Sequence, residues 1–506
     1  MSVLFKNAAI LIRKDAGYEA LENAYLGVEG KNIDYIGKDR PQKAYDEEKD
    51  YAGKLLLPGL INAHTHTPMV FLRGIADGLP LDRWLNEAIF PIEAKLMPEQ
   101  IRISSYYAIL ELLASGVTSF TDMYFFPEET AKAVKDSGIK ANLNKYILCF
   151  DENQAIEDSM ISPSIEFYEK YHDTCEGRLK VDFSIHAEYT NKPHIVKAYS
   201  QECKKRNAIM HIHLSETRSE VERCIETYHK TPVQWFEDLG TFENPVCAAH
   251  VVWPKEGDLK ILKKHDASVM HNPSSNLMIG SGIAPIRKML DMGINVGLGT
   301  DGAASNNNLN MLEEMHLAAI VHNGSNLDAT NIRSSQVIDM ATCNGAKLQG
   351  REDTGILEAG KRADLIALDL DRIHLYPLFS CPSIITKSAQ TSDVCMTMVD
   401  GRILYEDGHY LTLDRDQIVH DFKQAVKDAD KLKAISDRMH YHMDKKTRST
   451  LEVWGDAAEA EGKLPVLLKI VKDNEMIDLV EELGTTFFIG GYLSALDDVR
   501  QGEIKP

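Results

Sequence analysis

Two histidines, one residue apart, stand at the end of the first long apolar run of the chain. Residues 55–62 form that run, and His64 and His66 follow it directly. Because alternate residues of a strand face the same way, both imidazoles can point at one atom. Neutral imidazole is a common metal ligand, so the pair predicts part of a metal site. Two histidines satisfied by hydrogen bonds at a strand end would give the same pattern, so the prediction depends on further ligands.

Eight strand-like runs alternate with stretches of helical pattern in the middle of the chain. Residues 98–114, for example, have helical periodicity and end at Ser115 and Gly116, a helix stop signal. Eight such strand-then-helix units predict an α/β fold, a parallel TIM-type (β/α)8 barrel. The runs are 55–62, 117–123, 141–148, 180–186, 208–213, 246–251, 267–271 and 294–299.

Polar residues gather where these runs end. Barrels of this kind carry their chemistry at the carboxyl ends of the strands. We therefore expect the side chains at these positions to meet at one rim of the barrel. They are His64 and His66 after the first run, His186 after the fourth, His213 and Glu216 after the fifth, His250 after the sixth, His271 after the seventh and Asp301 after the eighth.

Four residues of this set suit a metal ion. His64, His66, His213 and Asp301 supply three imidazoles and one carboxylate. Such ligands fit one Zn²⁺ ion per chain, with Fe²⁺ as the alternative. Ligation without sulfur is typical of an open, catalytic site, in which the metal lowers the pKa of a bound water toward ~7.

Addition of hydroxide to an electrophilic carbon also needs groups that move protons. Glu216 lies three residues beyond His213, so it does not repeat that residue's direction on the strand. We interpret Glu216 as the group that protonates a substrate ring nitrogen. Asp301 can take the proton of the attacking water, and His250 can polarise that water and stabilise the oxyanion. Taken singly, each residue could equally be structural; the prediction depends on the set.

The two flanks of the barrel read as parts of one β-sandwich. Residues 1–56 and 353–415 both contain short apolar runs separated by Gly, Asn and Asp. The barrel is assigned to residues 57–352. Residues 416–506 form a charged extension with helical periodicity, for which packing or oligomerisation is the default role.

Composition limits the classes of partner. The 506 residues carry a net charge of −20, which argues against nucleic acid and against anionic membranes. The eight cysteines are scattered and form no Cys-x-x-Cys pair, which is typical of free thiols in a reducing cytoplasm. We expect a cytoplasmic protein, a small-molecule substrate and a homo-oligomer.

Two further motifs carry less weight. Residues 297–302 fit Gly-x-Gly-x-x-Gly, but a run of Ala, Ser and Asn follows where a helix should begin. His186 and Glu188 fit the His-x-Glu of the cytosine-type zinc deaminases, whose Pro-Cys-x-x-Cys partner is absent. His186 remains a candidate for contact with the substrate.

Several segments together resemble the amidohydrolase superfamily, and within it the methylthioadenosine/S-adenosylhomocysteine deaminases, relatives of guanine deaminases and triazine hydrolases. The resemblance covers roughly residues 1–415. The most specific segment is Gly299-Thr-Asp-Gly-Ala-Ala-Ser-Asn-Asn. The others are Pro58-Gly-Leu-Ile-Asn-Ala-His-Thr-His66, His213-Leu-Ser-Glu-Thr and His271-Asn-Pro-Ser-Ser-Asn-Leu.

The resemblance implies the same metal ligands and the same proton-moving residues, and it adds a substrate class: adenosine-type nucleosides that lose ammonia. It implies that Glu93 binds ribose hydroxyls and that Trp84 lines the purine or thioether pocket. Lys145 stands where relatives place an arginine for the far end of the substrate, and Glu188 replaces a proline. Methylthioadenosine, S-adenosylhomocysteine and adenosine therefore stay open, as do guanine or a triazine. A non-catalytic scaffold is the third alternative.

Overall fold

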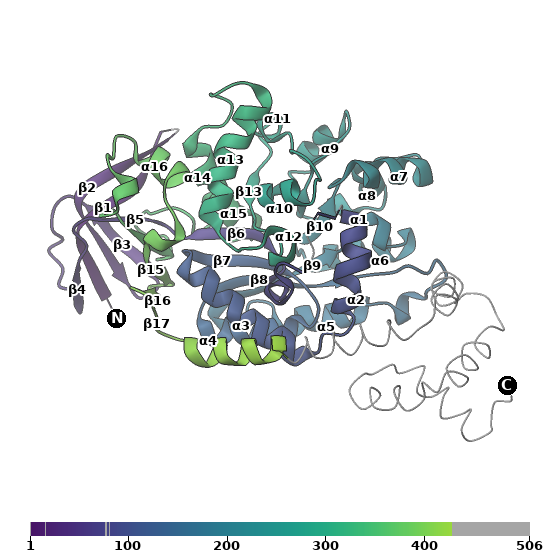
Figure 1. Cartoon of the computed structure of the whole chain (residues 1–506), viewed down its shortest axis with the longest axis horizontal. Coiled ribbons are helices and arrows are strands. Elements are labelled where there is room, and N and C mark those ends of the chain that lie inside the picture. Colours follow the sequence, from purple (N-terminus) through teal and green to yellow (C-terminus); the bar gives the residue numbers. More distant parts are fainter. Residues whose placement is uncertain (1, 16, 76–77, 80, 428–506) are drawn as a thin grey trace, which may run out of the picture. The chain divides into compact units, whose positions relative to one another are not determined.

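A parallel sheet of eight strands forms the centre of the computed structural model, which describes residues 2–15, 17–75, 78–79 and 81–427. Neighbouring strands follow one another in chain order from β6 to β13, and each adjacent pair is parallel. The bounds are β6 (Leu60–Thr65), β7 (Val117–Met123), β8 (Lys140–Ile147), β9 (Leu179–Ile185), β10 (Met210–Leu214), β11 (Val246–His250), β12 (Ser268–His271) and β13 (Val296–Leu298). The predicted α/β barrel is confirmed (Figure 1).

The last strand returns to the first through side chains and loop backbone. Thr300 N donates to Asn62 Oδ1 at 3.0 Å, and Asp301 N donates to the His64 carbonyl at 2.9 Å. Gly299 permits this approach, because an added Cβ would lie 2.7 Å from the backbone nitrogen of His64. Gly299, two residues before Asp301, is therefore needed to bring the two ends of the sheet together.

Helices cover the barrel and follow ordinary start and stop signals. Proline occupies the first turn of α3, α4, α6 and α8, where its missing N–H costs nothing. Gly138, with φ of 84°, ends α4. The helices between and after the strands are α3 (Pro98–Ala114), α4 (Pro127–Ser137), α5 (Ile161–Tyr171), α6 (Pro193–Lys205), α7 (Arg218–Tyr228), α8 (Pro232–Asp238), α9 (Asp258–Lys264), α10 (Pro273–Met278), α11 (Ile286–Asp291), α12 (Ala303–Asn306), α13 (Met311–Asn326), α14 (Ser334–Ala341) and α15 (Cys343–Leu348).

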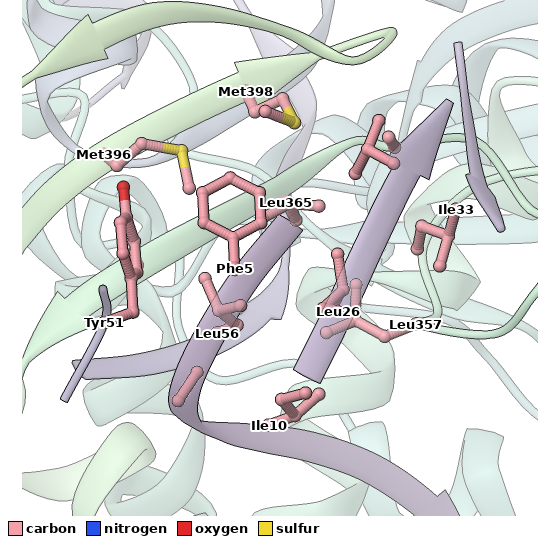
Figure 2. Close-up of a cluster of buried hydrophobic side chains, with 14 of the residues drawn as sticks. Phe5, Ile10, Leu26, Ile33, Tyr51, Leu56, Leu357, Leu365, Met396 and Met398 are labelled. Atoms are coloured by element: carbon pink, nitrogen blue, oxygen red, sulfur yellow. The ribbon is translucent and has the colours of Figure 1, made fainter. Parts of the chain in front are cut away.

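The two flanking pieces join, as expected, and they do so in one mixed sheet of nine strands. In Figure 1 the purple N-terminal strands lie beside the green strands β15 and β16. Phe5, Leu26, Leu56, Leu365 and Met396 pack together on this sheet and are buried (Figure 2). Its strands are β1 (Ser2–Lys14), β2 (Gly17–Glu29), β3 (Asn32–Gly37), β4 (Glu47–Asp50), β5 (Lys54–Pro58), β14 (Leu365–Asp369), β15 (Val394–Val399), β16 (Arg402–Glu406) and β17 (His409–Tyr410), with α16 (Cys381–Lys387) between β14 and β15.

The first predicted strand, 55–62, is in fact two strands in two sheets. β5 pairs with β1 and β14 in the mixed sheet, whereas β6 pairs with β7 in the barrel. Gly59 is the change-over, and its N–H donates to the Asp364 carbonyl at 3.0 Å. A Cβ there would lie 2.2 Å from Thr118 Cγ2, so the chain can cross only at a residue without a side chain.

The described chain ends in a helix over residues 415–427. Phe422 stacks on Tyr107, with 3.9 Å between ring centroids. The rest of the predicted helical extension, 428–506, lies outside the described residues. None of the helices that the structure describes is long and apolar enough to cross a membrane. All eight cysteines are free, as expected.

Candidate active site

The four predicted metal ligands lie together at the carboxyl ends of their strands. Potential ligand atoms of His64, His66 and Asp301 all lie within 4.8 Å of one another, as do those of His64, His213 and His250. Asp301 Oδ1 is 3.2 Å from His66 Nε2 and 3.4 Å from His64 Nε2. His64 is fully buried, yet its Nε2 has no hydrogen-bond partner. A buried lone pair facing a carboxylate and other imidazoles fits a cation, so the donor set suits the metal that the sequence predicted.

The outer ring nitrogens of two ligands fix their tautomers. His66 Nδ1 hydrogen-bonds the Met123 carbonyl, and His213 Nδ1 lies 2.8 Å from the His186 carbonyl. Because a carbonyl only accepts, each Nδ1 carries a proton, and Nε2 is the nitrogen that can ligate a metal. This is the usual arrangement behind a ligating histidine.

Asp301 is held ionised by the groups around it. Gly302 N donates to Oδ1 at 2.8 Å and Ser275 Oγ donates to Oδ2 at 2.7 Å. Burial alone would raise the pKa of Asp301, but the adjacent His64 and His66 rings hold that pKa well below its usual range. Asp301 therefore offers a carboxylate, both as a ligand and as a proton acceptor.

Glu216 lies beside the ligands in a different electrostatic state. Its Oε1 accepts from Ser281 Oγ at 3.2 Å, and its Oε2 is 3.8 Å from His250 Nε2. Burial raises the pKa of Glu216 to about 7, so this side chain can hold a proton near neutral pH. The two carboxyl groups of the site thus differ in protonation, as acid and base roles require.

His250 lies between these two carboxyl groups. Its Nε2 is 4.0 Å from Asp301 Oδ2, and its Nδ1 is 2.9 Å from Asn276 Oδ1. The backbone φ of 74° places His250 in the left-handed region at the end of β11. Strain of this kind is tolerated where surrounding contacts fix the residue, as they do here.

A cavity opens from this cluster. Of the predicted substrate contacts, Trp84, Glu93 and His186 line it. Trp84 comes from the short helical turn η2 (Trp84–Ile89), and Glu93 comes from α2 (Phe90–Glu93). Lys145 does not line it: its Nζ lies 2.8 Å from Glu128 Oε1. Tyr146, the next residue of β8, lines the cavity instead, because adjacent residues of a strand face opposite ways.

Several residues that support the site were not predicted. Ser275, Ser281 and Asn276 are loop or short-helix residues whose spacing carries no signal. His211 did carry one, since His211 and His213 repeat the spacing of His64 and His66. The structure places His211 against His64, with Nε2 2.9 Å from His64 Nδ1.

Glu188, the residue that departs from the resembled pattern, lies behind the catalytic cluster. It is buried beside Glu220, and burial together with that neighbour raises the pKa of Glu188 well above its usual value. Glu220 Oε2 in turn accepts from the backbone N–H groups of Glu216 and Thr217, at 2.8 and 3.1 Å. The pair thus fixes the backbone that carries Glu216.

Known proteins are similar to this chain in both sequence and fold. A 5-methylthioadenosine/S-adenosylhomocysteine deaminase of Thermoanaerobacter pseudethanolicus is 39% identical over 429 residues, covering 84% of this chain and 99% of that protein. A 5′-deoxyadenosine deaminase of Methanosarcina acetivorans is 40% identical over 428 residues, covering 84% and 98%. The crystal structure of a zinc-bound adenosine deaminase from Xanthomonas campestris has a TM-score of 0.79 at 28% identity, covering 84% and 98%.

The profile of the Amidohydrolase family matches residues 55–404, which include every predicted metal ligand. The resemblance inferred from short segments is therefore confirmed over most of the chain. The chain belongs to the amidohydrolase family.

Proposed function

We propose that this protein is a metal-dependent deaminase of adenosine-type nucleosides, which it converts to the inosine analogue and ammonia. The observation that carries the proposal is the pairing of an ionised Asp301 with a protonatable Glu216 on either side of His250, beside a cavity lined by the predicted substrate contacts Trp84, Glu93 and His186. Relatives named as deaminases of 5-methylthioadenosine, S-adenosylhomocysteine and 5′-deoxyadenosine support the substrate class.

The roles of the residues follow from their protonation. His64, His66, His213 and Asp301 would hold Zn²⁺, or Fe²⁺, one ion per chain. The ion supplies a Lewis acid that makes water a nucleophile at neutral pH. Asp301, as a carboxylate, takes the proton that water gives up on adding to the carbon that bears the amino group.

Glu216 delivers a proton to the ring nitrogen next to that carbon. Its raised pKa keeps the proton available at neutral pH. His250 Nε2 lies 3.8 Å from Glu216 Oε2 and 4.0 Å from Asp301 Oδ2, where it can interact with the oxygen on which negative charge develops. The proton held by Asp301 then passes to the amino group, the C–N bond breaks and ammonia leaves, while the hydroxyl proton of the intermediate returns to Glu216 as the carbonyl forms.

Glu93 and Trp84 are proposed to hold the nucleoside. Glu93 is buried in the cavity wall and its Oε1 has no hydrogen-bond partner, so it can accept from ribose hydroxyls. Trp84 Nε1 also lacks a partner and can donate to the substrate. His186 lines the same cavity, and burial lowers its pKa to about 3, so it contacts substrate as a neutral ring.

We further propose a preference for a small, uncharged 5′ substituent, as in methylthioadenosine or 5′-deoxyadenosine. Among the described residues, none that lines the cavity is a lysine or arginine. A homocysteine carboxylate would find no cation there, and bidentate capture by arginine would be lost. Arg223 lines a second cavity, which shares Leu81, Leu85, Phe90 and Tyr189 with the first.

The test is ammonia release from a panel of methylthioadenosine, 5′-deoxyadenosine, adenosine, S-adenosylhomocysteine, guanine and a triazine. We expect turnover of the uncharged 5′-substituted adenosines, and a loss of about 10²–10⁴-fold in Glu216→Gln. Wild-type turnover in Glu216→Gln or Asp301→Asn would contradict the mechanism. Equal turnover of S-adenosylhomocysteine that disappears in Arg223→Met would contradict the substrate preference. A cytoplasmic location and a homo-oligomeric state stay predictions from the sequence.

A further inference from the structure

A row of three buried side chains runs from the metal site into the barrel. His64 Nδ1 lies 2.9 Å from His211 Nε2, and His211 Nδ1 lies 3.3 Å from Asn144 Nδ2. All three residues are fully buried. They come from β6, β10 and β8, so the row crosses the interior of the barrel.

The first contact of the row constrains where one proton lies. Two imidazole nitrogens 2.9 Å apart need a single proton between them. If His211 Nε2 carries it, neutral His64 has its own proton on Nε2 and cannot ligate a metal through that atom. If His64 Nδ1 carries it, Nε2 has a lone pair and faces Asp301 Oδ1 at 3.4 Å. Only the second arrangement serves a ligand.

The second contact bears on this choice: in the orientation shown, Asn144 Nδ2 faces His211 Nδ1, which would leave the shared proton on His211 Nε2, and the opposite amide orientation gives the second arrangement. With the proton on His64 Nδ1, neutral His211 is protonated on Nδ1 and needs an acceptor there. Asn144 can provide it through Oδ1, which has no hydrogen-bond partner in the described part of the chain. A half-turn of the amide exchanges Nδ2 and Oδ1 without changing its shape. The orientation of the Asn144 amide thus determines which nitrogen of His64 carries the proton.

We propose that Asn144 and His211 are positioning residues that keep the proton on Nδ1 of His64 and so direct its Nε2 to the metal. His66 and His213 achieve the same result with backbone carbonyls, which no substitution removes. Among these three histidines, His64 therefore has the tautomer that side chains set. The inference rests on the metal site and not on the identity of the substrate.

The test measures zinc affinity by competition with a chelator, so it needs no substrate. Asn144→Leu removes the acceptor at similar volume, and we expect zinc affinity to fall about 10–100-fold, the usual effect of losing a partner behind a ligating histidine. Asn144→Asp keeps an acceptor and should retain at least wild-type affinity.

Asn142→Leu is the matched control. Asn142 lies two residues earlier on β8 and donates to Asp182 at 3.0 Å, away from the histidines. We expect it to lower thermal stability and to leave zinc affinity unchanged. Unchanged affinity in Asn144→Leu, or equal losses in Asn144→Leu and Asn144→Asp, would overturn the proposal.

A second measurement covers the case in which Asn144→Leu does not fold. The ¹⁵N chemical shifts of the histidine rings in zinc-loaded wild-type protein report which nitrogen carries the proton. We expect Nδ1–H on both His64 and His211. A proton on Nε2 of His211 would overturn the proposal. Because neither readout depends on turnover, failure of the proposed deaminase activity would leave this result interpretable.

Discussion

Ser281 should tune the pH range over which Glu216 can donate a proton. Its hydroxyl donates to Glu216 Oε1 at 3.2 Å, and burial already raises the pKa of Glu216 to about 7. The hydroxyl stabilises the ionised form, so Ser281→Ala should raise the pKa further. A hydrogen bond to a charged group contributes ~1.5–3 kcal/mol, and this long one falls at the lower end. Since one pKa unit corresponds to about 1.4 kcal/mol, the shift should be about one unit upward.

The assay is kcat/KM for the preferred nucleoside as a function of pH in metal-loaded wild type and Ser281→Ala. Because the proposed mechanism needs Glu216 protonated, the alkaline limb should move about one unit to higher pH. The loop should survive the change, because Trp253 Nε1 donates to the Ser281 backbone carbonyl at 2.6 Å. Ser325→Ala is the control, since Ser325 Oγ donates to the His322 carbonyl outside the cavity. An alkaline limb that stays in place or moves to lower pH would refute the role of Glu216.

Three further predictions concern groups around this centre. Glu220→Ala removes the acceptor for the Glu216 backbone N–H, so it should lower the free energy of unfolding by about 2 kcal/mol and reduce kcat. Glu220→Gln keeps an acceptor and should lose less of both. Urea unfolding and the kinetics of both variants test this. Burial raises the pKa of Glu314 to about 8, so the stability contributed by its protonated form is lost as pH rises from about 4 to 8. In urea unfolding, Glu314→Gln should reduce this decline in the free energy of unfolding by on the order of 2–4 kcal/mol. Parallel pH profiles of the variant and the wild type would count against the prediction. Burial would lower the pKa of His66, but Asp301 raises it to about 9, so zinc binding should release this proton; zinc affinity should then rise up to tenfold per pH unit below pH 9, and a flat profile would contradict it.

The metal ligands could be predicted because topology leaves them little freedom. Parallel strands end at the same rim, so a histidine or aspartate just after a strand must face its counterparts on neighbouring strands. His64, His213 and Asp301 are separated by up to 237 positions, yet each is fixed by its distance from a strand end. The exact start of β10 or β13 hardly matters to that argument.

The substrate contact expected at Lys145 came from the resemblance, which does not give the register of the strand. On a strand, a shift of one residue turns a side chain to the other face. Lys145 and Tyr146 are adjacent on β8, and Tyr146 faces the cavity while Lys145 pairs with Glu128. An apolar run has no internal mark of its register, so sequence alone could not choose between them. For the same reason the sequence did not show that the run 55–62 passes from one sheet to the other at Gly59, where the chain lies too close to Thr118 for any side chain.

The residues that hydrogen-bond the titratable side chains, and so set their pKa values, are harder to predict than the titratable side chains themselves. Ser281 reaches Glu216 from a loop 65 residues away, and Ser275 reaches Asp301 from α10. Neither contact follows from strand order, because loops and short helices approach the rim from outside the sheet. His211 is the exception: it lies inside the barrel, two residues before His213, and the strand period that placed the ligands also placed it. The chemistry of such a site should therefore be most readable from sequence in the barrel interior, and least readable in the loops that set its pKa values.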